Sequence, residues 1–298
     1  METVVKGGMR SGTLKEVLRG KLKSYLITLP EELRLEVAKN INICGGAIAS
    51  GLIGEKINDY DVYFTNIETA KMVADYYIEL TGVDTKPIIT DFTDINGVTE
   101  PRLYLRTKSD GVRSIDVSEI VKDPSKKFYP RFITDNAISL TDKIQLITRF
   151  TGEPDKIHSN FDYAHAMCSY NYFTNTLNVS QEALESMLSR TLIYRGSLYP
   201  IASVFRMRKF IRRGWKITAG QILKIVFQIN KLDLASIETL ADQLTGVDLH
   251  YMSNLLNRLN GKSLYELEHN YVCTVLDEIF GDVEETNMVH EDVPSSPI

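Results

Sequence analysis

The chain has 298 residues, 43% of them hydrophobic and 24% charged, which is typical of a soluble globular protein large enough for two domains. No apolar run approaches the roughly 20 residues of a membrane span, and the first residues lack the apolar core of a secretory signal. Three widely spaced cysteines (Cys44, Cys168 and Cys273) exclude a C-x-x-C zinc pattern and a disulfide framework, and they favour a reducing, cytoplasmic location.

The N-terminal region, residues 1–39, is predicted to contain two helices. Residues 14–26 and 31–39 both space their apolar side chains at helical intervals. Pro30 followed by two glutamates is a favourable start for the second helix, because acidic side chains stabilise the positive end of the helix dipole.

A strand, a glycine pair and a short helix are predicted next. Residues 41–44 form a short apolar strand that ends at Gly45 and Gly46. Residues 47–54 then form one or two helical turns closed by Gly54. A glycine pair by itself indicates only a tight turn, so its meaning depends on the neighbouring elements.

The next strand carries two aspartates. Residues 59–64 alternate acidic and apolar side chains, so Asp59 and Asp61 are predicted to project from the same face. Two ionised carboxylates this close need a counter-charge, and Mg²⁺ suits oxygen ligands that share its shell with phosphates. A D-x-D pair is common by chance, whereas this pair after a strand, two glycines and a helix is much rarer.

Residues 66–80 are predicted to form a helix, and strands come after it. Residues 102–107 and 112–117 flank a Lys-Ser-Asp-Gly turn and are predicted to form a hairpin. The second of these strands carries Asp116 between two β-branched residues. Asp116 is either a third acid of the site or an ordinary exposed strand residue.

The sheet is predicted to end near residue 152. Two strands, residues 131–140 and 143–151, precede Gly-Glu-Pro, and the chain beyond has helical patterns. A mixed sheet flanked by helices and followed by an all-helical domain is an α+β plan. The predicted parts are residues 1–39, a head domain at 40–152, a helical domain at 153–281 and an acidic, mobile tail at 282–298. The predicted helices beyond the sheet are 161–170, 181–191, 200–213, 219–230, 234–244, 249–259 and 264–280.

Charge is distributed unevenly along the helical region. Residues 186–232 hold ten Lys or Arg and no acid, although the whole chain has a net charge of −5. In the helix predicted at 200–213 the basic side chains form one stripe and the apolar ones another. Such a stripe suits a phosphate backbone, and the alternative is a solvated face paired with acids from elsewhere. The predicted nucleic-acid-binding residues are Arg206, Lys209, Arg212, Arg213 and Lys216.

The stretch from residue 41 to 65 resembles the head of the tRNA nucleotidyltransferase / poly(A) polymerase branch of the polymerase-β-like nucleotidyltransferases. The signature of that family reads G-G-x-V-R-D-x-L-L-G-x-x-x-x-D-x-D-x-x-T. It is matched without a gap by Gly45, Gly46, Ile48, Leu52, Ile53, Gly54, Asp59 and Asp61, and Thr65 lies one residue beyond the position of the motif's final Thr. A second motif, R-D-F-T-I-N-A-L, is matched by Arg131, Thr134, Asn136 and Ala137, with Phe132 in place of its Asp. The compact form also resembles versions carried by bacteriophages.

Two positions depart from the first motif. Ala49 replaces the family's Arg and Ser50 its Asp, and both support the nucleotide-binding loop in the family. The later motif that reads the incoming base, E-D-x-x-R, is not visible. The nucleotide selected and the efficiency of the reaction are therefore open.

The resemblance implies a metal-dependent nucleotidyltransferase that binds a nucleoside triphosphate, ATP among the candidates. Asp59, Asp61 and Asp116 would be the catalytic residues and the ligands of two Mg²⁺ ions, for which Mn²⁺ could substitute. In this family the third carboxylate stands on a strand next to the D-x-D strand. The nucleotide would contact Gly45, Gly46, Ser50, Arg131 and Asn136.

Residues 158–172 are rich in histidine and aromatic side chains. Asp162 and His165 would face together on a helix, close to His158 and Cys168. Three interpretations remain open: a zinc site, a polar patch in place of the base-reading motif, and core packing.

Three functions are compatible with the sequence. The first is a tRNA-processing type of enzyme that transfers NMP to the 3′ end of a tRNA-like RNA. The second is a nucleotidyltransferase that modifies a small-molecule or protein hydroxyl, as toxin and resistance enzymes do. The third is a non-catalytic protein that binds a nucleotide or nucleic acid within a larger assembly. The cytoplasm, that of the host for a viral protein, is the expected location, without a membrane partner.

Overall fold

The computed structural model describes residues 7–93, 97–107, 114–116, 127–134 and 136–232, together with residues 239 and 243. The chain divides into two compact units, one that extends to Ser189 and one that begins at Arg190. The first unit combines helices with a mixed sheet, so the predicted α+β class is confirmed. None of the helices among the described residues is long and apolar enough to cross a membrane.

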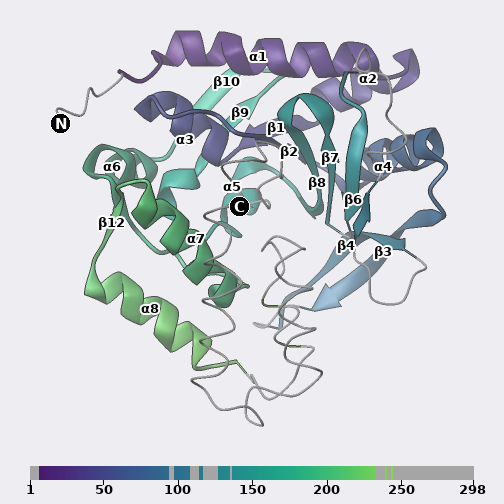
Figure 1. Ribbon diagram of the computed structural model, residues 1–298. Coiled ribbons are helices and arrows are strands. Elements are labelled where there is room, and N and C mark those ends of the chain that lie inside the picture. Colours follow the sequence, from purple (N-terminus) through teal and green to yellow (C-terminus); the bar gives the residue numbers. More distant parts are fainter. Residues whose placement is uncertain are drawn as a thin grey trace. The chain divides into compact units, whose positions relative to one another are not determined.

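The N-terminal helices α1 (Ser11–Thr28) and α2 (Glu31–Lys39) confirm the predicted pair and run along the top of Figure 1. Leu14, Leu18, Leu22 and Tyr25 recur every three or four residues along α1, and all four are fully buried. This spacing places them on one face of the helix. Burial of that apolar face holds α1 against the rest of the first unit.

The core of the first unit is an eight-stranded mixed sheet. All its neighbouring strands are antiparallel except one central pair, β2 and β8, which is parallel. Parallel neighbours need a crossover, and the described residues between these two strands include the helix α4 and the strands β3 to β7. The strand order is β10 (Thr176–Val179), β9 (Cys168–Asn171), β1 (Ile41–Cys44), β2 (Tyr60–Phe64), β8 (Ile144–Thr151), β7 (Ala137–Leu140), β6 (Pro130–Thr134) and β5 (Ser114–Asp116).

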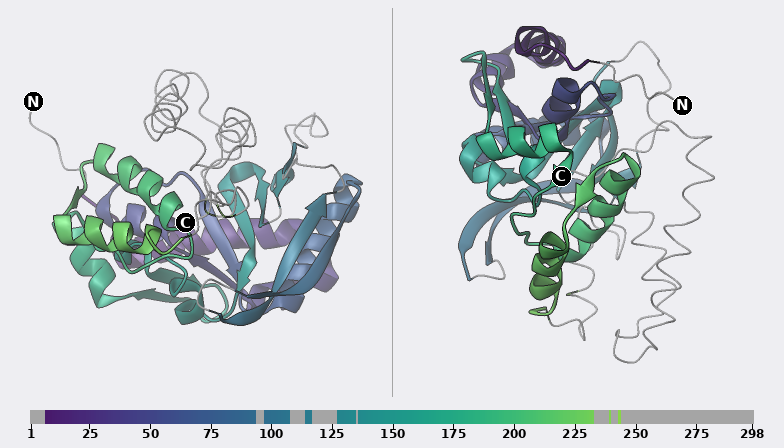
Figure 2. Two further views of the ribbon diagram at one scale, coloured as in Figure 1. Left: turned by 90° about the horizontal axis from the view of Figure 1, so that it is seen from below. Right: turned by 90° about the vertical axis from the view of Figure 1, so that its left-hand side faces the viewer.

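Four further helices belong to this unit: α3 (Gly46–Ile53), α4 (Ile67–Thr81), α5 (Pro154–His158) and α6 (Gln181–Ser189). Gly54 ends α3 in the left-handed conformation, as the sequence predicted, and so lets the chain turn back into β2. A second, two-stranded sheet of β3 (Thr85–Thr93) and β4 (Thr99–Thr107) lies beside the large one in both views of Figure 2.

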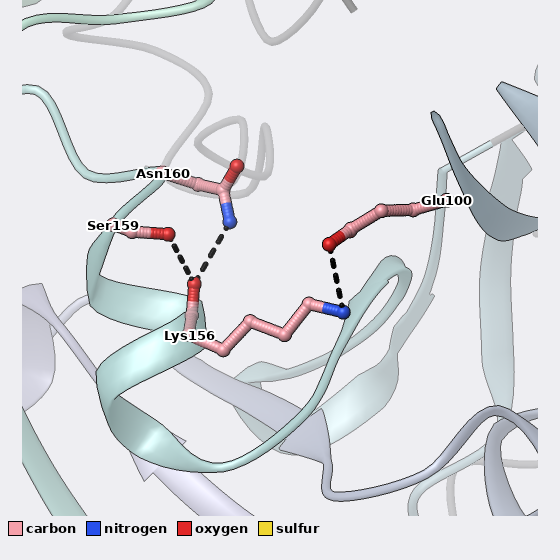
Figure 3. A network of polar contacts seen from close by, with 4 residues as sticks. All are labelled: Glu100, Lys156, Ser159 and Asn160. Atoms are coloured by element: carbon pink, nitrogen blue, oxygen red, sulfur yellow. Dashed lines mark hydrogen bonds and ion pairs between the residues drawn. The ribbon is translucent and has the colours of Figure 1, made fainter. Parts of the chain in front are cut away.

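Helix α5 is tied to this small sheet at the surface. The Lys156 ammonium lies 3.1 Å from a carboxylate oxygen of Glu100 on β4, and both side chains are about half exposed. The side chains of Ser159 and Asn160 donate hydrogen bonds to the Lys156 carbonyl oxygen and satisfy the end of the helix (Figure 3). An exposed ion pair of this kind contributes only about 0–1 kcal/mol to stability.

The N-terminus of α4 provides a test of local stability. The side-chain oxygen of Asn66 accepts a hydrogen bond of 2.8 Å from the backbone N–H of Thr69. Replacing Asn66 with alanine removes this cap, so we expect the free energy of unfolding to fall by about 0.5–2 kcal/mol. Urea denaturation followed by circular dichroism measures this change, and an unchanged midpoint would show that the cap contributes nothing.

Two local predictions are wrong. The strand predicted at residues 131–140 is a hairpin of β6 and β7, because Thr134 closes a turn there. Residues 161–170 are not a helix but contain a short 3₁₀ turn, η2 (Ala164–Ala166), and the start of β9. The turn of the hairpin predicted around residues 108–111 lies outside the described residues, among which β4 pairs with β3 and β5 pairs with β6.

The boundary predicted at residue 152 also differs from the arrangement observed. Strands β9 and β10 lie beyond residue 152, yet β9 pairs with β1 and extends the large sheet. The chain divides between Ser189 and Arg190 instead. The backbone hydrogen bonds of β1 explain this, because β1 lies between two strands, β2 and β9, that are far apart in sequence.

The described part of the second unit contains helices α7 (Pro200–Arg212) and α8 (Ala219–Ile229), both as predicted. They are accompanied by the two-residue strands β11 (Thr191–Leu192) and β12 (Lys216–Ile217). Gln228 of α8 accepts hydrogen bonds from Tyr194 and Ser197 and so fixes the loop before α7. The helices predicted at 234–244, 249–259 and 264–280 and the acidic tail lie outside the described residues, apart from positions 239 and 243.

Candidate active site

The turn after β1 requires its glycine. Gly45 has φ 85° and ψ −138°, a backbone conformation that side chains exclude, and its N–H donates a 3.0 Å hydrogen bond to the Cys168 carbonyl. Gly46 is the first residue of α3. The first N–H groups of a helix have no acceptor within the helix, so they can bind an anion. The structure therefore confirms a strand, a glycine turn and a helix in the predicted order.

The two aspartates lie at the start of the neighbouring strand. Asp61 belongs to β2 and is 7% exposed, whereas Asp59 immediately precedes the strand and is partly exposed. Ile43 pairs with Val62 in the antiparallel ladder of β1 and β2. Continuing this register places Cys44 beside Asp61 and brings the glycine turn and Asp59 to the same edge of the sheet. The sequence-predicted glycines and aspartates are thus brought together.

The Cys44 thiol is buried in the neighbourhood of Asp61 and Cys168. Burial raises the pKa of this thiol well above its usual value, and the charges of the Asp61 carboxylate and of Cys168 raise this pKa further. A nearby negative charge disfavours the thiolate, so Cys44 stays in the thiol form.

Polar side chains continue from Asp61 across the sheet. Asp61 pairs with Gln145 of β8, and Gln145 pairs with Ser139 of β7. Directly paired residues project from the same face of a sheet. Gln145 Nε2 donates a 3.4 Å hydrogen bond to Ser139 Oγ, and both residues are only 6% exposed. Gln145 was not identified from the sequence, because its importance depends on the pairing of β8 with β2.

Asp116 does not lie next to the D-x-D strand. Its strand β5 is at the end of the sheet, and β6, β7 and β8 separate it from β2. Four strand spacings of about 4.8 Å correspond to about 19 Å across the sheet. The prediction that Asp116 lies on a neighbouring strand is therefore wrong. Asp116 and Asp61 nevertheless stand at the two ends of one row of paired residues across the sheet. The successive members of this row are Asp116, Phe132, Ser139, Gln145 and Asp61.

The predicted ligands of Mg²⁺ do not all lie together. Asp59 and Asp61 supply two carboxylates, and the binding of Mg²⁺ by them stays a prediction. Gln145 and Cys44 are the neighbours of Asp61 on the adjacent strands, and neither supplies a third carboxylate. Within the described residues no group of three His, Cys, Asp or Glu side chains could hold a metal ion. The second Mg²⁺ ion likewise stays a prediction.

The second motif mainly builds a turn. Thr134 Oγ1 accepts hydrogen bonds from the backbone N–H groups of Asn136 and Ala137 and donates to the Ala137 carbonyl. Arg131 is the extra residue of a bulge in β6, between the paired Pro130 and Phe132. The predicted contacts of Arg131, Asn136 and Ser50 with a nucleotide stay predictions.

Asn136 has a partner that the sequence did not reveal. Its side-chain oxygen accepts a 3.0 Å hydrogen bond from Arg149 of β8. Arg149 and Arg102 are both buried, and both guanidinium groups lie within 6 Å of the Phe92 ring centroid, Arg102 at 3.7 Å. In the sequence, the grouping of Arg102 and Arg149 around Phe92 is signalled only by Arg149 standing next to the aromatic residue Phe150.

The residues singled out at 158–172 are buried. Nε2 of His158 is hydrogen-bonded to the Cys168 carbonyl at 3.1 Å, and the His165 ring stacks on Tyr163. Burial lowers the pKa of His158, and the hydrogen bond to Cys168 opposes this shift. Asp162 and Cys168 are buried as well. These contacts favour core packing over the zinc interpretation.

The two buried thiols are expected to be chemically inert. Burial raises the pKa of Cys168 to about 12, and the pKa of Cys44 is raised as well. Because the thiolate is the reactive form, iodoacetamide at pH 8 should leave both residues unmodified in the native protein and label them in urea. Peptide mass spectrometry measures this, and native labelling of Cys44 would contradict the packing.

The raised pKa values of the two thiols also predict how stability depends on pH. Unfolded thiols ionise above about pH 8.5, whereas the folded thiols stay protonated, so the free energy of unfolding should fall as the pH rises above this value.

The predicted nucleic-acid-binding residues lie in the second unit. Arg206, Lys209 and Arg212 belong to α7, Arg213 comes directly after it, and Lys216 begins β12. The Arg213 guanidinium lies 5.4 Å from the Phe210 ring centroid, and that ring packs edge-on against Trp215. The aromatic residues thus support the basic helix from its buried side, while contact with nucleic acid remains a prediction.

A family model matches most of the first unit. The model of the Gabija anti-defense 2 family matches residues 16–190, from α1 to the end of the first unit. The chain belongs to the Gabija anti-defense 2 family. The match includes the glycine turn, both aspartates and the polar row on β8 and β7.

One curated relative from this family is named Gabija anti-defense 2 and comes from Bacillus phage SPbetaL7. It is 24% identical to the chain over 107 residues. The aligned part covers 35% of this chain and 27% of the relative, so the chain spans about a quarter of the length of the relative it matches.

Solved structures of CCA-adding enzymes are similar to the chain at low identity. The Thermotoga maritima enzyme complexed with tRNA is 11% identical, with a TM-score of 0.38 and coverage of 90% of this chain and 54% of the enzyme. An apo form of a CCA-adding enzyme is 12% identical, with a TM-score of 0.41 and coverage of 96% and 63%. The Bacillus stearothermophilus enzyme with CTP is 12% identical, with a TM-score of 0.37 and coverage of 83% and 52%.

Proposed function

We propose that this protein counteracts the Gabija defence by nucleotidyl transfer. The single observation that carries the proposal is the convergence of the Gly45 turn, the start of α3 and the Asp59/Asp61 pair at one edge of the sheet. Family membership supports the anti-defence role, because the matched residues contain this whole edge.

The proposed reaction joins a hydroxyl group to the α-phosphorus of a nucleoside triphosphate. The new oxygen–phosphorus bond forms as the bond to the pyrophosphate oxygen breaks, the hydroxyl proton is lost to solvent, and pyrophosphate leaves. The N–H groups at the start of α3 would bind the phosphates at the glycine turn. Asp59 and Asp61 would hold Mg²⁺, which neutralises the charge that develops on the phosphate oxygens.

The first acceptor that we propose is the 3′ end of an RNA. It is supported by the basic residues of α7 and β12 and by the resemblance of the two sequence motifs. A hydroxyl on a protein component of the Gabija defence is the second candidate, and the anti-defence family favours it.

A non-catalytic role is favoured by one specific feature. Gln145 and Cys44, rather than an acid, neighbour Asp61 on the adjacent strands. A protein of this kind would bind nucleotide or a partner at the same edge without transferring a nucleotidyl group.

Two measurements distinguish these functions. The purified chain is incubated with each α-³²P nucleoside triphosphate, Mg²⁺, and either total bacterial RNA or extracts of cells with and without Gabija. In parallel, phage plating is measured on Gabija-carrying cells that express the protein. Label on RNA supports the first acceptor, and label on a protein found only in Gabija cells supports the second. Restored plating without label in any fraction would favour the non-catalytic role.

A further inference from the structure

Three lysines converge beside the start of β2. Lys21 comes from α1, Lys127 precedes β6, and Lys143 ends the turn between β7 and β8. We call these three residues the lysine cluster. Lys21 Nζ donates a 2.9 Å hydrogen bond to the Asp142 carbonyl and lies 5.1 Å from the Tyr60 ring centroid. Its ammonium is thus held in place by a carbonyl and a ring rather than by a carboxylate.

The backbone around the lysine cluster is strained. Phe128, Asp142 and Lys143 all have positive φ, at 55°, 60° and 63°, although none of them is glycine. Such residues are uncommon, and three in contact occur where the surroundings enforce them. The Asp142 carboxylate accepts the Phe128 N–H at 3.2 Å, and the backbone N–H of Tyr129 and the side chain of Thr141 form a further link at 3.0 Å. These hydrogen bonds hold the turn at residues 127–128 against the turn at residues 141–143.

The lysine cluster has more positive than negative charge. Among the charges of the described residues that act on Lys21, the acid Asp142 attracts it, whereas Lys143 and Lys127 both repel it. Burial is the largest cause that lowers the pKa of Lys21, and this repulsion lowers the pKa further. Within the described residues neither Lys127 nor Lys143 forms an ion pair, and both are exposed. An anion at this place would relieve the repulsion.

The position of the lysine cluster relates it to the candidate active site. Ile144 pairs with Tyr60 in the parallel ladder of β8 and β2. Lys143 comes just before this ladder, and Lys21 lies over the ring of Tyr60, the residue that follows Asp59. Because successive strand residues project to opposite faces, the lysine cluster lies at the edge where β2 begins, on the face opposite to Asp61. The start of α3 supplies donors for a triphosphate, so the exposed lysines are better suited to a chain of phosphodiesters that continues along the surface.

We propose that the lysine cluster binds the phosphate backbone of a single-stranded RNA, whose chain then passes around the edge of the sheet toward Asp59. The lysine cluster belongs to the first unit, which the family model matches, whereas α7 belongs to the second unit. The description of the RNA as an acceptor rests on the proposed function, whereas phosphate binding by the lysine cluster does not.

Binding of a fluorescent 12-nucleotide RNA to the full chain, measured by anisotropy at several salt concentrations, tests this site. The variant combines Lys127→Gln with Lys143→Asn, because asparagine tolerates the left-handed conformation of residue 143. The control combines Lys23→Gln with Lys39→Gln, which removes two exposed lysines from α1 and α2. Loss of two phosphate contacts should lower the salt slope by about 1.4 and weaken binding about tenfold or more in low salt, with less than a twofold effect in the control.

Two outcomes would overturn the inference. Equal losses in the variant and the control would mean that only overall charge matters. A loss of nucleoside triphosphate affinity without any loss of RNA affinity would assign the bound phosphate to the nucleotide. Failure of the proposed function alone would give a different result. The Lys127→Gln/Lys143→Asn variant would still show the expected fall in the salt slope of RNA binding relative to wild type, but the wild-type protein would transfer no label.

Discussion

Replacing Asp61 with asparagine is expected to abolish nucleotide incorporation while the protein stays folded. The change removes one negative charge from a buried carboxylate and keeps its shape, so Gln145 and Cys44 keep their neighbour. Loss of a metal-binding carboxylate removes several kcal/mol of transition-state stabilisation, which corresponds to a rate lower by about a hundredfold or more. Transfer of α-³²P label and plating on Gabija-carrying cells should fall together.

Asp75→Asn is the matched control for this prediction. Asp75 forms an exposed ion pair of 2.6 Å with Lys71 one turn earlier in α4, so its loss should leave activity unchanged and stability nearly so. Label transfer by Asp61→Asn at more than half the wild-type rate would remove Asp61 from the chemistry. If plating were still restored while transfer was lost, the anti-defence role would be independent of transfer.

The second large effect is expected at Gly45. Alanine at this position would have to adopt φ 85° and ψ −138°, or the turn between β1 and α3 would have to move. Strain of this kind costs about 1–3 kcal/mol, and relaxation of the turn would displace the N–H groups at the start of α3. We therefore expect Gly45→Ala to lower the unfolding midpoint and to weaken nucleoside triphosphate binding about tenfold or more, measured by calorimetry.

Gly82→Ala separates these two effects. Gly82 also has a positive φ, 65°, but it ends α4, and no atom lies within 4 Å of an added Cβ. This variant should lose about 1–2 kcal/mol of stability and bind nucleotide normally. Equal nucleotide affinity of Gly45→Ala and the wild type would show that the turn does not contact the phosphates.

The neighbours of Asp61 bear on the number of metal ions that the proposed site would hold. Asp59 and Asp61 would supply ligands for one ion, and the strands beside Asp61 present Gln145 and Cys44 instead of a third acid. The chain keeps the two aspartates of the motif it resembles without an acid next to Asp61 on these two strands. Transfer and anti-defence activity should therefore be measured separately.

The sequence by itself determined the local elements of the candidate site. The order of strand, glycine pair, short helix and strand was predictable because each element depends on neighbouring residues. Gly45 and Gly54 have the conformations that only glycine adopts easily, and β2 begins at Tyr60, between the two aspartates. The helices α1, α4, α7 and α8 were likewise predictable from periodic apolar side chains.

Only the tertiary structure decided which strands are neighbours. Alternation identifies a strand, but its partner is selected by hydrogen bonds and packing between residues far apart in the chain. Asp116 therefore lies four strands from β2, Gln145 lies beside Asp61, and β9 joins β1 after more than a hundred intervening residues. The lysine cluster has the same origin, because α1 and the two turns that form it meet only when the sheet is assembled.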